Sequence, residues 1–182
     1  MSIIALRMIK FSKPNGPWGE LSNFYEHEVP LVYDGKQWAT SEHLYQALRY
    51  VWPGAPEANA DYVELIRTAS TPFKAKILAR QLCLEKYSWQ RELTSLIKAQ
   101  QAKGIQHRLD WEAEKVAVMR TVLQLKFTQD QHCASILRAT GTAEIGEESA
   151  TDNVWALGAN GKGENRLGKL LCVIRDLIKP TQ

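Results

Sequence analysis

Apolar and polar positions alternate in two segments near the start of the chain. Residues 3–11 (IIALRMIKF) and 29–38 (VPLVYDGKQW) carry β-branched and aromatic side chains in partial alternation, which is the pattern of short strands. The second segment contains the pair Asp34-Gly35, and this dipeptide favours the tight turn of a β-hairpin. The pattern predicts a small sheet near the N-terminus.

After residue 40 the apolar positions recur every third or fourth residue, as in amphipathic helices. Thr40 and Ser41 supply a hydroxyl for an N-cap, Pro72 suits a first helical position, and Gly104 is a stop signal. The helices expected are 40–52, about 61–69, 72–83, 88–102, 110–129, 131–139 and 167–178. The predicted fold class is α+β: one helix-rich domain over residues 1–182 with a small sheet from short N-terminal strands.

The longest predicted helix, 110–129, is expected to begin at Asp110 as its N-cap. Its buried stripe is expected to contain Val116, Met119, Leu123 and Phe127, and Lys115 and Lys126 lie outside that stripe. Such a stripe belongs to a core far more often than to a cofactor site. The segment 87–103 is polar on most sides, which predicts a surface helix.

The first predicted helix has one polar face. Helical spacing places Glu42, Tyr45 and Arg49 on that face, with Gln46 beside them. Glu42 also lies in the first turn, where the helix dipole favours an acid. Its role is therefore open between helix stabilisation and chemistry.

The segment 16–28 combines Trp18, Asn23, Phe24 and Tyr25 with glycines and a proline, without a clear period. A loop of this composition is either folded under the protein or forms part of a ligand-binding surface. Composition alone favours the first alternative.

The segment 147–168 (EESATDNVWALGANGKGENRLG) is too polar and too rich in glycine for regular core structure, so a loop is predicted. It precedes the last helix, whose first backbone N–H groups could bind an anion. Gly158, Gly161 and Gly163 would allow close approach of a ligand, and Lys162 and Arg166 would supply charge for a phosphate. The alternative is a mobile surface loop capped by Asn165. The segment matches no named nucleotide motif.

Composition narrows the class of protein. The 182 residues are 45% hydrophobic and 24% charged, which fits a soluble domain large enough to fold without a disulfide or metal. Lys and Arg within the apolar N-terminal segment argue against a signal peptide, so a cytoplasmic location is expected. A net charge of +3 does not demand nucleic acid, although a phosphorylated substrate would suit it.

The metal-binding residue types show no ligand spacing. Cys83, Cys133 and Cys172 are far apart and odd in number, and the four histidines are also scattered. We therefore expect reduced thiols, no bound metal and no cofactor.

Several segments, taken in order, resemble the YbiA-like family, also called NADAR. They are GPWGELSNFY, DGKQWATSEHLYQA, DWEAEKVAVMRTVLQLKF, ILRATG and IGEESATDNVWALGANGKGENRLGKLL. The resemblance extends from Phe11 to Arg175 and implies a compact α+β domain that hydrolyses N-glycosidic bonds of phosphoribosyl compounds. Some family members act on unstable intermediates of riboflavin synthesis, and others remove ADP-ribose from guanine bases.

The resemblance also implies active-site candidates. These are Glu42 in the SEH segment, Asp152 and Trp155 in the D-x-x-W segment, and Glu147. Glu42 would act as general base or electrostatic stabiliser, Asp152 as a ribose ligand or second acid/base, and Trp155 would stack on the base, with Trp18 or Tyr45 opposite. The phosphate is expected on the Gly161-Lys162-Gly163 loop, Asn165 and Arg166.

This sequence departs from the family pattern in three places. Arg49 stands where a lysine is common, and an arginine cannot form an imine with the sugar because it stays protonated. The W-G-x-G segment reads Trp155-Ala156-Leu157-Gly158, which is expected to reshape the loop beside the ligand. The surface helix at 87–103 is the third departure and could carry a specificity contact.

Three functions remain open at this point: an N-glycosidase for a riboflavin-pathway intermediate such as a ribosylaminopyrimidine 5′-phosphate, a hydrolase that removes ADP-ribose from guanine in nucleic acid, and a non-catalytic module that binds ADP-ribose or NAD. Lys126 and Lys162 are the candidates to replace the lysine absent at position 49. We expect instead that no imine forms and that Glu42 and Asp152 act through water.

Overall fold

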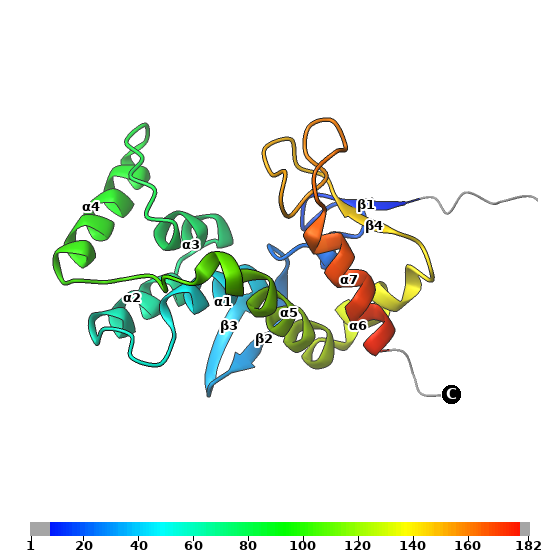
Figure 1. Ribbon diagram of the computed structural model, residues 1–182, viewed down its shortest axis with the longest axis horizontal. Helices are drawn as coiled ribbons and strands as arrows, with labels where there is room; N and C mark the ends of the chain where they lie inside the picture. Colours follow the sequence, from blue (N-terminus) through cyan, green and yellow to red (C-terminus); the bar gives the residue numbers. More distant parts are fainter. Residues whose placement is uncertain (1–7, 179–182) are drawn as a thin grey trace, which may run out of the picture.

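A computed structural model describes residues 8–178 of the chain, and Figure 1 shows an α+β fold in which helices predominate. The elements are β1 (Ile9–Phe11), the 3-10 turn η1 (Gly19–Leu21), β2 (Glu26–Tyr33), β3 (Lys36–Thr40), α1 (Ser41–Ala47), the 3-10 turn η2 (Leu48–Tyr50), α2 (Ala58–Arg67), α3 (Pro72–Ala79), α4 (Ser88–Ala102), α5 (Trp111–Gln129), α6 (Gln131–Ala139), β4 (Ile145–Glu147) and α7 (Arg166–Leu177). The predicted fold class is confirmed.

The β2–β3 hairpin agrees with the sequence pattern. The two strands are antiparallel, with Leu31 opposite Trp38 and Tyr33 opposite Lys36. Asp34 and Gly35 form the turn at φ values of 51° and 68°, the left-handed conformations that a tight hairpin turn requires. The strand β2 begins at Glu26, three residues before the predicted start. Of the other predicted strand, 3–11, residues 3–7 lie outside the described part, and β1 accounts for its end.

A second pair of strands was not predicted. β1 and β4 are parallel, with Ile9 opposite Ile145 and Phe11 opposite Glu147. Three residues of β4 that include a glycine are too short to show a period, so the pattern alone could not identify this strand. The pairing places Glu147 at the point where the chain leaves the sheet for the loop 148–165.

The helix α5 joins the two ends of the molecule. It contacts α1, α6, α7 and β2, while α2, α3 and α4 gather at one end and the β1–β4 pair lies at the other (Figure 1). Its buried side chains are Trp111, Met119, Val122, Leu123, Lys126 and Phe127. Two expectations are therefore corrected: Val116 is only partly buried, and Lys126 lies inside the buried stripe rather than outside it.

Helix starts followed the predicted chemistry more closely than helix ends did. Thr40 Oγ1 accepts the His43 N–H at 3.3 Å, and Pro72 is the first residue of α3. Asp110 is at the N-cap position of α5 but makes no capping bond, because its carboxylate pairs with Arg108 Nε at 2.7 Å. Predicted helix 40–52 ends as an α-helix at residue 47, predicted 72–83 ends at 79, and predicted 61–69 runs from 58 to 67. Within the described residues, no helix is both long and apolar enough to cross a lipid bilayer.

The contact between α7 and β4 requires a glycine. A Cβ atom on Gly168 would lie 2.0 Å from the Ile145 carbonyl oxygen, and the Asn165 side-chain amide donates to the same oxygen at 2.8 Å. Asn165 is therefore at the N-cap position of α7, but its side chain makes no capping bond and instead ties the loop to β4.

We expect Gly168→Ala to lower the free energy of unfolding by about 3 kcal/mol or more, because the backbone carbonyl cannot move away without breaking the β1–β4 pair. Gly141→Ala is the control: Gly141 has a φ of 62° and open space around its Cβ position, so only backbone strain of about 1 kcal/mol applies. Urea unfolding measures both. An equal loss in the two variants would contradict this account of the contact.

Candidate active site

A cleft of about 720 Å³ lies where the N-terminal segments, α1, α3, α5 and the loop after β4 meet. Side chains from residues 12–14, 22–24, 42–49, 73–80, 111–119 and 147–155 line it. Nine of the residues predicted for the site are among them: Asn23, Phe24, Glu42, Tyr45, Gln46, Arg49, Glu147, Asp152 and Trp155. The loop carrying Asn23 and Phe24 thus forms part of the cleft, although composition alone had favoured a purely structural role.

The helix α1 places an acid at the base of the cleft. Glu42 is 6% exposed, and its backbone N–H donates to the Asn23 carbonyl at 2.9 Å. Its Oε1 accepts the Gln46 side-chain amide at 2.8 Å, one helical turn later. Burial raises the pKa of Glu42, while Lys76, the Gln46 hydrogen bond and Arg80 act in the opposite direction.

A second acid enters the cleft from β4. Glu147 has its pKa raised to about 7, first by burial and next by the negative charges of Glu42 and Asp152. Two carboxyl groups that face one cleft resist simultaneous ionisation. At neutral pH, Glu147 is therefore able to hold a proton, which a general acid must do.

The third predicted acid shapes the loop. Asp152 Oδ1 accepts the backbone N–H groups of Val154 at 2.9 Å and Trp155 at 2.7 Å. This turn directs the chain back so that the Trp155 ring meets the Tyr45 ring, with centroids 5.8 Å apart. Asp152 thus positions Trp155 and still lines the cleft with the rest of its carboxylate.

Aromatic rings cover one side of the cleft. Tyr45 contacts Trp155 on one side and Trp111 on the other, with ring centroids 5.2 Å apart in the second pair. The Arg49 guanidinium carbon lies 4.7 Å from the centre of the Trp111 ring. Trp111 was not predicted to be part of the site. It is the first residue of α5 and is buried.

Two side-chain oxygen atoms of residues in the cleft are buried and unpaired among the described residues. Asn23 Oδ1 and Gln46 Oε1 are buried and have no hydrogen-bond partner among the described residues. Their residues both line the cleft. Because an unpaired buried acceptor is costly, N–H or O–H groups of a substrate are natural partners for them.

Lys76 and Arg80 are the cations that sequence reasoning missed. Both line the cleft, and both favour the ionised form of Glu42. Their separation by four residues, across the last turn of α3 and the residue that follows it, was the signal that could have identified them. Lys13 and Lys115 also line the cleft, and Lys115 pairs with Glu112.

Six residues predicted to bind substrate do not line the cleft. Trp18 packs against the core. The others belong to the loop and the start of α7: Gly161, Lys162, Gly163, Asn165 and Arg166.

Hydrogen bonds within the loop explain this difference. The backbone N–H groups of residues 164, 165, 166 and 167 donate to the carbonyl groups of residues 153, 156, 154 and 155, so they are not available to an anion. A Cβ on Gly163 would lie 2.3 Å from the Ala156 carbonyl oxygen, which makes this glycine a contact inside the loop. Lys162 is exposed, and Arg166 pairs with Glu164 at 2.7 Å.

The segment Ala156-Leu157, which departs from the family's W-G-x-G pattern after Trp155, packs inside the protein. Both residues are buried, and Leu157 fills the space above Gly146, where a Cβ would lie 2.8 Å from Leu157 Cδ1. The altered segment thus anchors the loop to β4 and leaves Trp155 at the cleft.

Neither lysine proposed as a nucleophile faces the cleft. Lys162 is on the exposed loop, and Lys126 has 0% of its surface exposed and donates to the Ser22 carbonyl at 2.7 Å. Among the described lysines, those that line the cleft are Lys13, Lys76 and Lys115.

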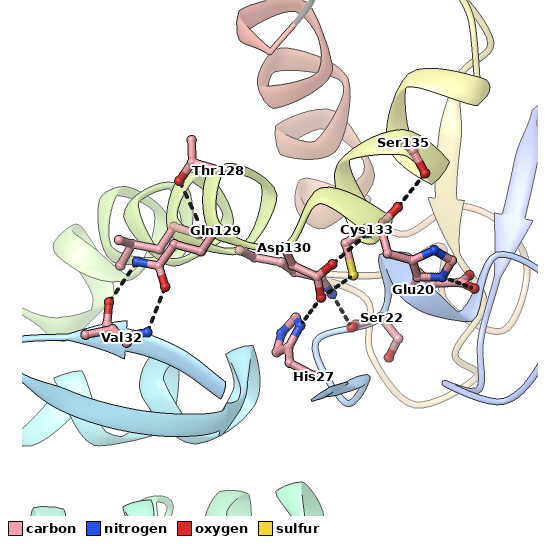
Figure 2. Close-up of polar contacts among 12 residues, drawn as sticks. Glu20, Ser22, His27, Val32, Thr128, Gln129, Asp130, Cys133 and Ser135 are labelled. Atoms are coloured by element: carbon pink, nitrogen blue, oxygen red, sulfur yellow. Dashed lines mark hydrogen bonds and ion pairs between the residues drawn. The ribbon is translucent and has the colours of Figure 1, made fainter. Parts of the chain in front are cut away.

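His27, Asp130 and Cys133 are brought together in space although their sequence spacing gave no metal signal. One possible ligand atom from each lies within 4.8 Å of the others. Asp130 Oδ2 already accepts His27 Nδ1 at 2.6 Å and the Cys133 thiol at 3.2 Å, as Figure 2 shows. These residues do not line the cleft.

Comparisons with known proteins relate the whole chain to one family. The family described as NADAR domain matches residues 10–179. N-glycosidase YbiA of Shigella boydii is 33% identical over 171 residues, which cover 94% of this chain and 88% of that protein. Riboflavin biosynthesis protein PYRR of Zea mays is 30% identical over 96% of this chain and 26% of its own length. The NMR structure of YbiA from Escherichia coli matches with a TM-score of 0.71 and 31% identity, over 97% of this chain and 87% of that one.

The raised pKa of Glu147 predicts a pH-dependent stability difference between the wild type and Glu147→Gln. Between about pH 4.5 and pH 7 the unfolded chain releases this proton while the folded chain keeps it, so the wild type loses stability as the pH rises. The amide has no charge to bury. The variant should therefore gain about 1–3 kcal/mol relative to the wild type between acidic and mildly alkaline pH.

Urea unfolding at several pH values measures this difference. Glu148→Gln, at an exposed neighbouring acid, is the control and should show no such gain. Parallel stability curves for the wild type and Glu147→Gln would contradict the assignment.

Proposed function

We infer that this chain, which belongs to the NADAR family, is an N-glycosidase that hydrolyses the ribose–nitrogen bond of a phosphoribosyl compound. We propose a substrate from riboflavin biosynthesis, such as a ribosylaminopyrimidine 5′-phosphate, because relatives that match nearly the whole chain are named for N-glycosidase activity and for riboflavin biosynthesis. The observation that supports this most strongly is the presence of two acids, the buried Glu42 and the partly buried Glu147, in one aromatic-lined cleft.

Cleavage of a ribose–nitrogen bond develops positive charge at C1 and negative charge on the departing nitrogen. If Glu42 and Glu147 hold one proton between them, the ionised acid can stabilise the positive charge at C1 and the protonated acid can neutralise the departing nitrogen. Burial raises the pKa of both acids, and Lys76 favours the carboxylate at both. Arg80 and the Gln46 amide favour the carboxylate at Glu42, and the Glu42 charge favours the acid at Glu147. We therefore assign the proton to Glu147.

In the proposed reaction the C1–N bond breaks as Glu147 donates its proton to the departing nitrogen. The Glu42 carboxylate stabilises the charge at C1 and accepts a proton from the attacking water, whose oxygen bonds to C1. A proton then passes from Glu42 to solvent and another returns to Glu147, which restores the starting state. Asp152 is assigned to a ribose hydroxyl.

The rest of the cleft provides binding. Trp155, Tyr45 and Trp111 offer ring surface to the base, and the acceptors of Asn23 and Gln46 offer partners for its N–H groups. Lys76 and Arg80 are assigned to the 5′-phosphate in place of Lys162 and Arg166. A phosphate needs positive charge inside the cleft, and these two residues supply it there.

A second candidate function has one specific observation in its favour. Phe73, at the mouth of the cleft, is 50% exposed and contacts Trp89, which lies nearly parallel to Tyr87 at 6.3 Å. Lys74 and Lys86 lie over these rings. Exposed aromatic rings with lysines suit nucleobases and phosphates, so removal of ADP-ribose from guanine in nucleic acid is the alternative.

Incubation with ribosylaminopyrimidine 5′-phosphate and, separately, with ADP-ribosylated guanine DNA tests the assignment. We expect ribose 5-phosphate to be released from the first. Glu42→Gln should abolish this release and leave the dissociation constant within about tenfold, because the amide keeps the shape and loses the charge that the transition state needs. Turnover of the DNA alone would select the second function, and binding without turnover of either would reduce the protein to a binding module.

Single substitutions of two lysines test where the substrate phosphate binds. Lys76→Met should raise KM for a 5′-phosphorylated substrate by about tenfold or more, since a charge-assisted contact of a few kcal/mol is lost. Lys162→Met removes an exposed lysine outside the cleft and should leave KM within about twofold. The reverse order of effects would return the phosphate to the glycine-rich loop.

A further inference from the structure

Lys126 is a fully buried cation that has no role in the chemistry above. It lies in the last turns of α5 with 0% of its surface exposed. Its ammonium group donates to the carbonyl of Ser22, a residue 104 positions earlier in the chain, at 2.7 Å. It also lies 5.7 Å and 5.4 Å from the centres of the Tyr25 and Phe127 rings. Burying an ammonium group costs several kcal/mol of folding free energy unless its surroundings compensate it. The position of this lysine therefore requires an explanation.

The carbonyl that accepts the hydrogen bond from Lys126 is part of Ser22, a residue that lines the cleft. Ser22, Asn23 and Phe24 form a turn that lines it, and the Ser22 hydroxyl accepts the Phe24 N–H at 3.2 Å. The next carbonyl, that of Asn23, accepts the N–H of Glu42. Lys126 thus holds one side of this turn while the other side holds the first turn of α1.

A second set of bonds holds together the elements that surround Lys126. Asp130 lies between α5 and α6. It accepts hydrogen bonds from the His27 ring of β2 and from the backbone N–H and thiol of Cys133 in α6, and Figure 2 shows these bonds near Ser22. These bonds use both Asp130 oxygen atoms, which favours a structural hydrogen-bond network over a metal site at this cluster. The nearby Lys126 ammonium would also repel a divalent cation.

We propose that Lys126 is a positioning residue for Glu42: its buried ammonium fixes the Ser22–Phe24 turn, and the turn fixes the carboxylate through the Asn23 carbonyl. The proposal rests on the proposed function, because it assigns Lys126 to the accuracy of the same reaction. A charged donor suits the task since its hydrogen bond is about twice as strong as that of a neutral one.

The charges around Lys126 set the pH range in which it acts. Burial lowers its pKa to about 8, and the groups that oppose this are Cys133, Asp130 and Glu20. Tyr25 and His27 face the same region, and the pKa of His27 is lowered by burial and by Lys126. As the pH rises above about 8, the ammonium loses its proton and its bond to Ser22 weakens.

Two properties should then move in opposite directions. The folded chain releases the Lys126 proton at about pH 8, and the unfolded chain keeps it until about 10.5. The wild type should therefore gain stability relative to Lys126→Met over this range. Glu147 also loses its proton above about pH 7, which lowers kcat in the wild type and in Lys126→Met alike. Over the pH range in which Lys126 titrates, kcat of the wild type should fall by about three- to tenfold more than kcat of Lys126→Met. A purely structural role predicts parallel kcat profiles for the two proteins while the wild-type fold becomes more stable.

Substitution tests the proposal directly. Lys126→Met should lower kcat by about 30- to 100-fold and change KM by less than about threefold, because the carboxylate is displaced while the binding groups remain. Thr94→Val is the matched control: the Thr94 hydroxyl is also buried and donates to a backbone carbonyl, that of Leu84, at 2.8 Å, but neither residue lines the cleft. It should lose stability without changing kcat.

Amide hydrogen exchange provides a measurement that does not depend on activity. Lys126→Met should lower the protection of the Glu42 and Phe24 amides by about tenfold or more, and Thr94→Val should not. If the wild type turned over no ribosyl substrate but this change appeared, the proposed function would fail and the positioning role would stand. Unchanged protection together with unchanged kcat would overturn the proposal. If Lys126→Met does not fold, Lys126→Gln takes its place in the kcat, pH and hydrogen-exchange measurements.

Discussion

Two carboxyl groups that share one cleft and are largely shielded from water cannot both ionise without an electrostatic cost, and the site depends on this constraint. Glu42 comes from α1 and Glu147 from β4, so only the folded chain brings the two acids together. We assign one proton to the pair and place it on Glu147, because Arg80 and the Gln46 amide favour the carboxylate at Glu42 and the Glu42 charge raises the pKa of Glu147. Unequal division gives one acid and one base, which is what cleavage of a glycosidic bond requires.

The architecture keeps the two acids in place through contacts of different kinds. The parallel pairing of Phe11 with Glu147 fixes the second acid, and the close packing of Gly168 on the Ile145 carbonyl holds α7 against the same strand. On the opposite side, the Asn23 carbonyl fixes the start of α1. Backbone contacts therefore hold both proposed reacting groups, and the loop 148–165 brings Asp152 and Trp155 to the cleft.

Local signals in the sequence predicted the parts of the fold that depend on neighbouring residues. The Thr40 cap, Pro72 and the Asp34-Gly35 turn act within a few residues, and helical spacing was enough to align Glu42, Tyr45, Gln46 and Arg49. Features that depend on distant partners were missed. From the sequence, a lysine such as Lys126 is expected on the surface, because its partner, the Ser22 carbonyl, is distant in the chain. The strand β4 is too short to be predicted without knowledge of its pairing with β1. The loop N–H groups were expected to bind an anion, but carbonyl groups of the same loop take them.

The central claim is that the carboxyl groups cleave the bond through water and that no lysine attacks the sugar. The cleft-lining lysines Lys13, Lys76 and Lys115 are the groups that could contradict it. Reaction with ribosylaminopyrimidine 5′-phosphate in the presence of borohydride, followed by intact-mass measurement, tests the claim most directly, because borohydride reduces an imine to a stable amine. We predict complete substrate turnover with no change in protein mass. A sugar adduct on any lysine would contradict the account, and its position in the peptide map would identify the nucleophile.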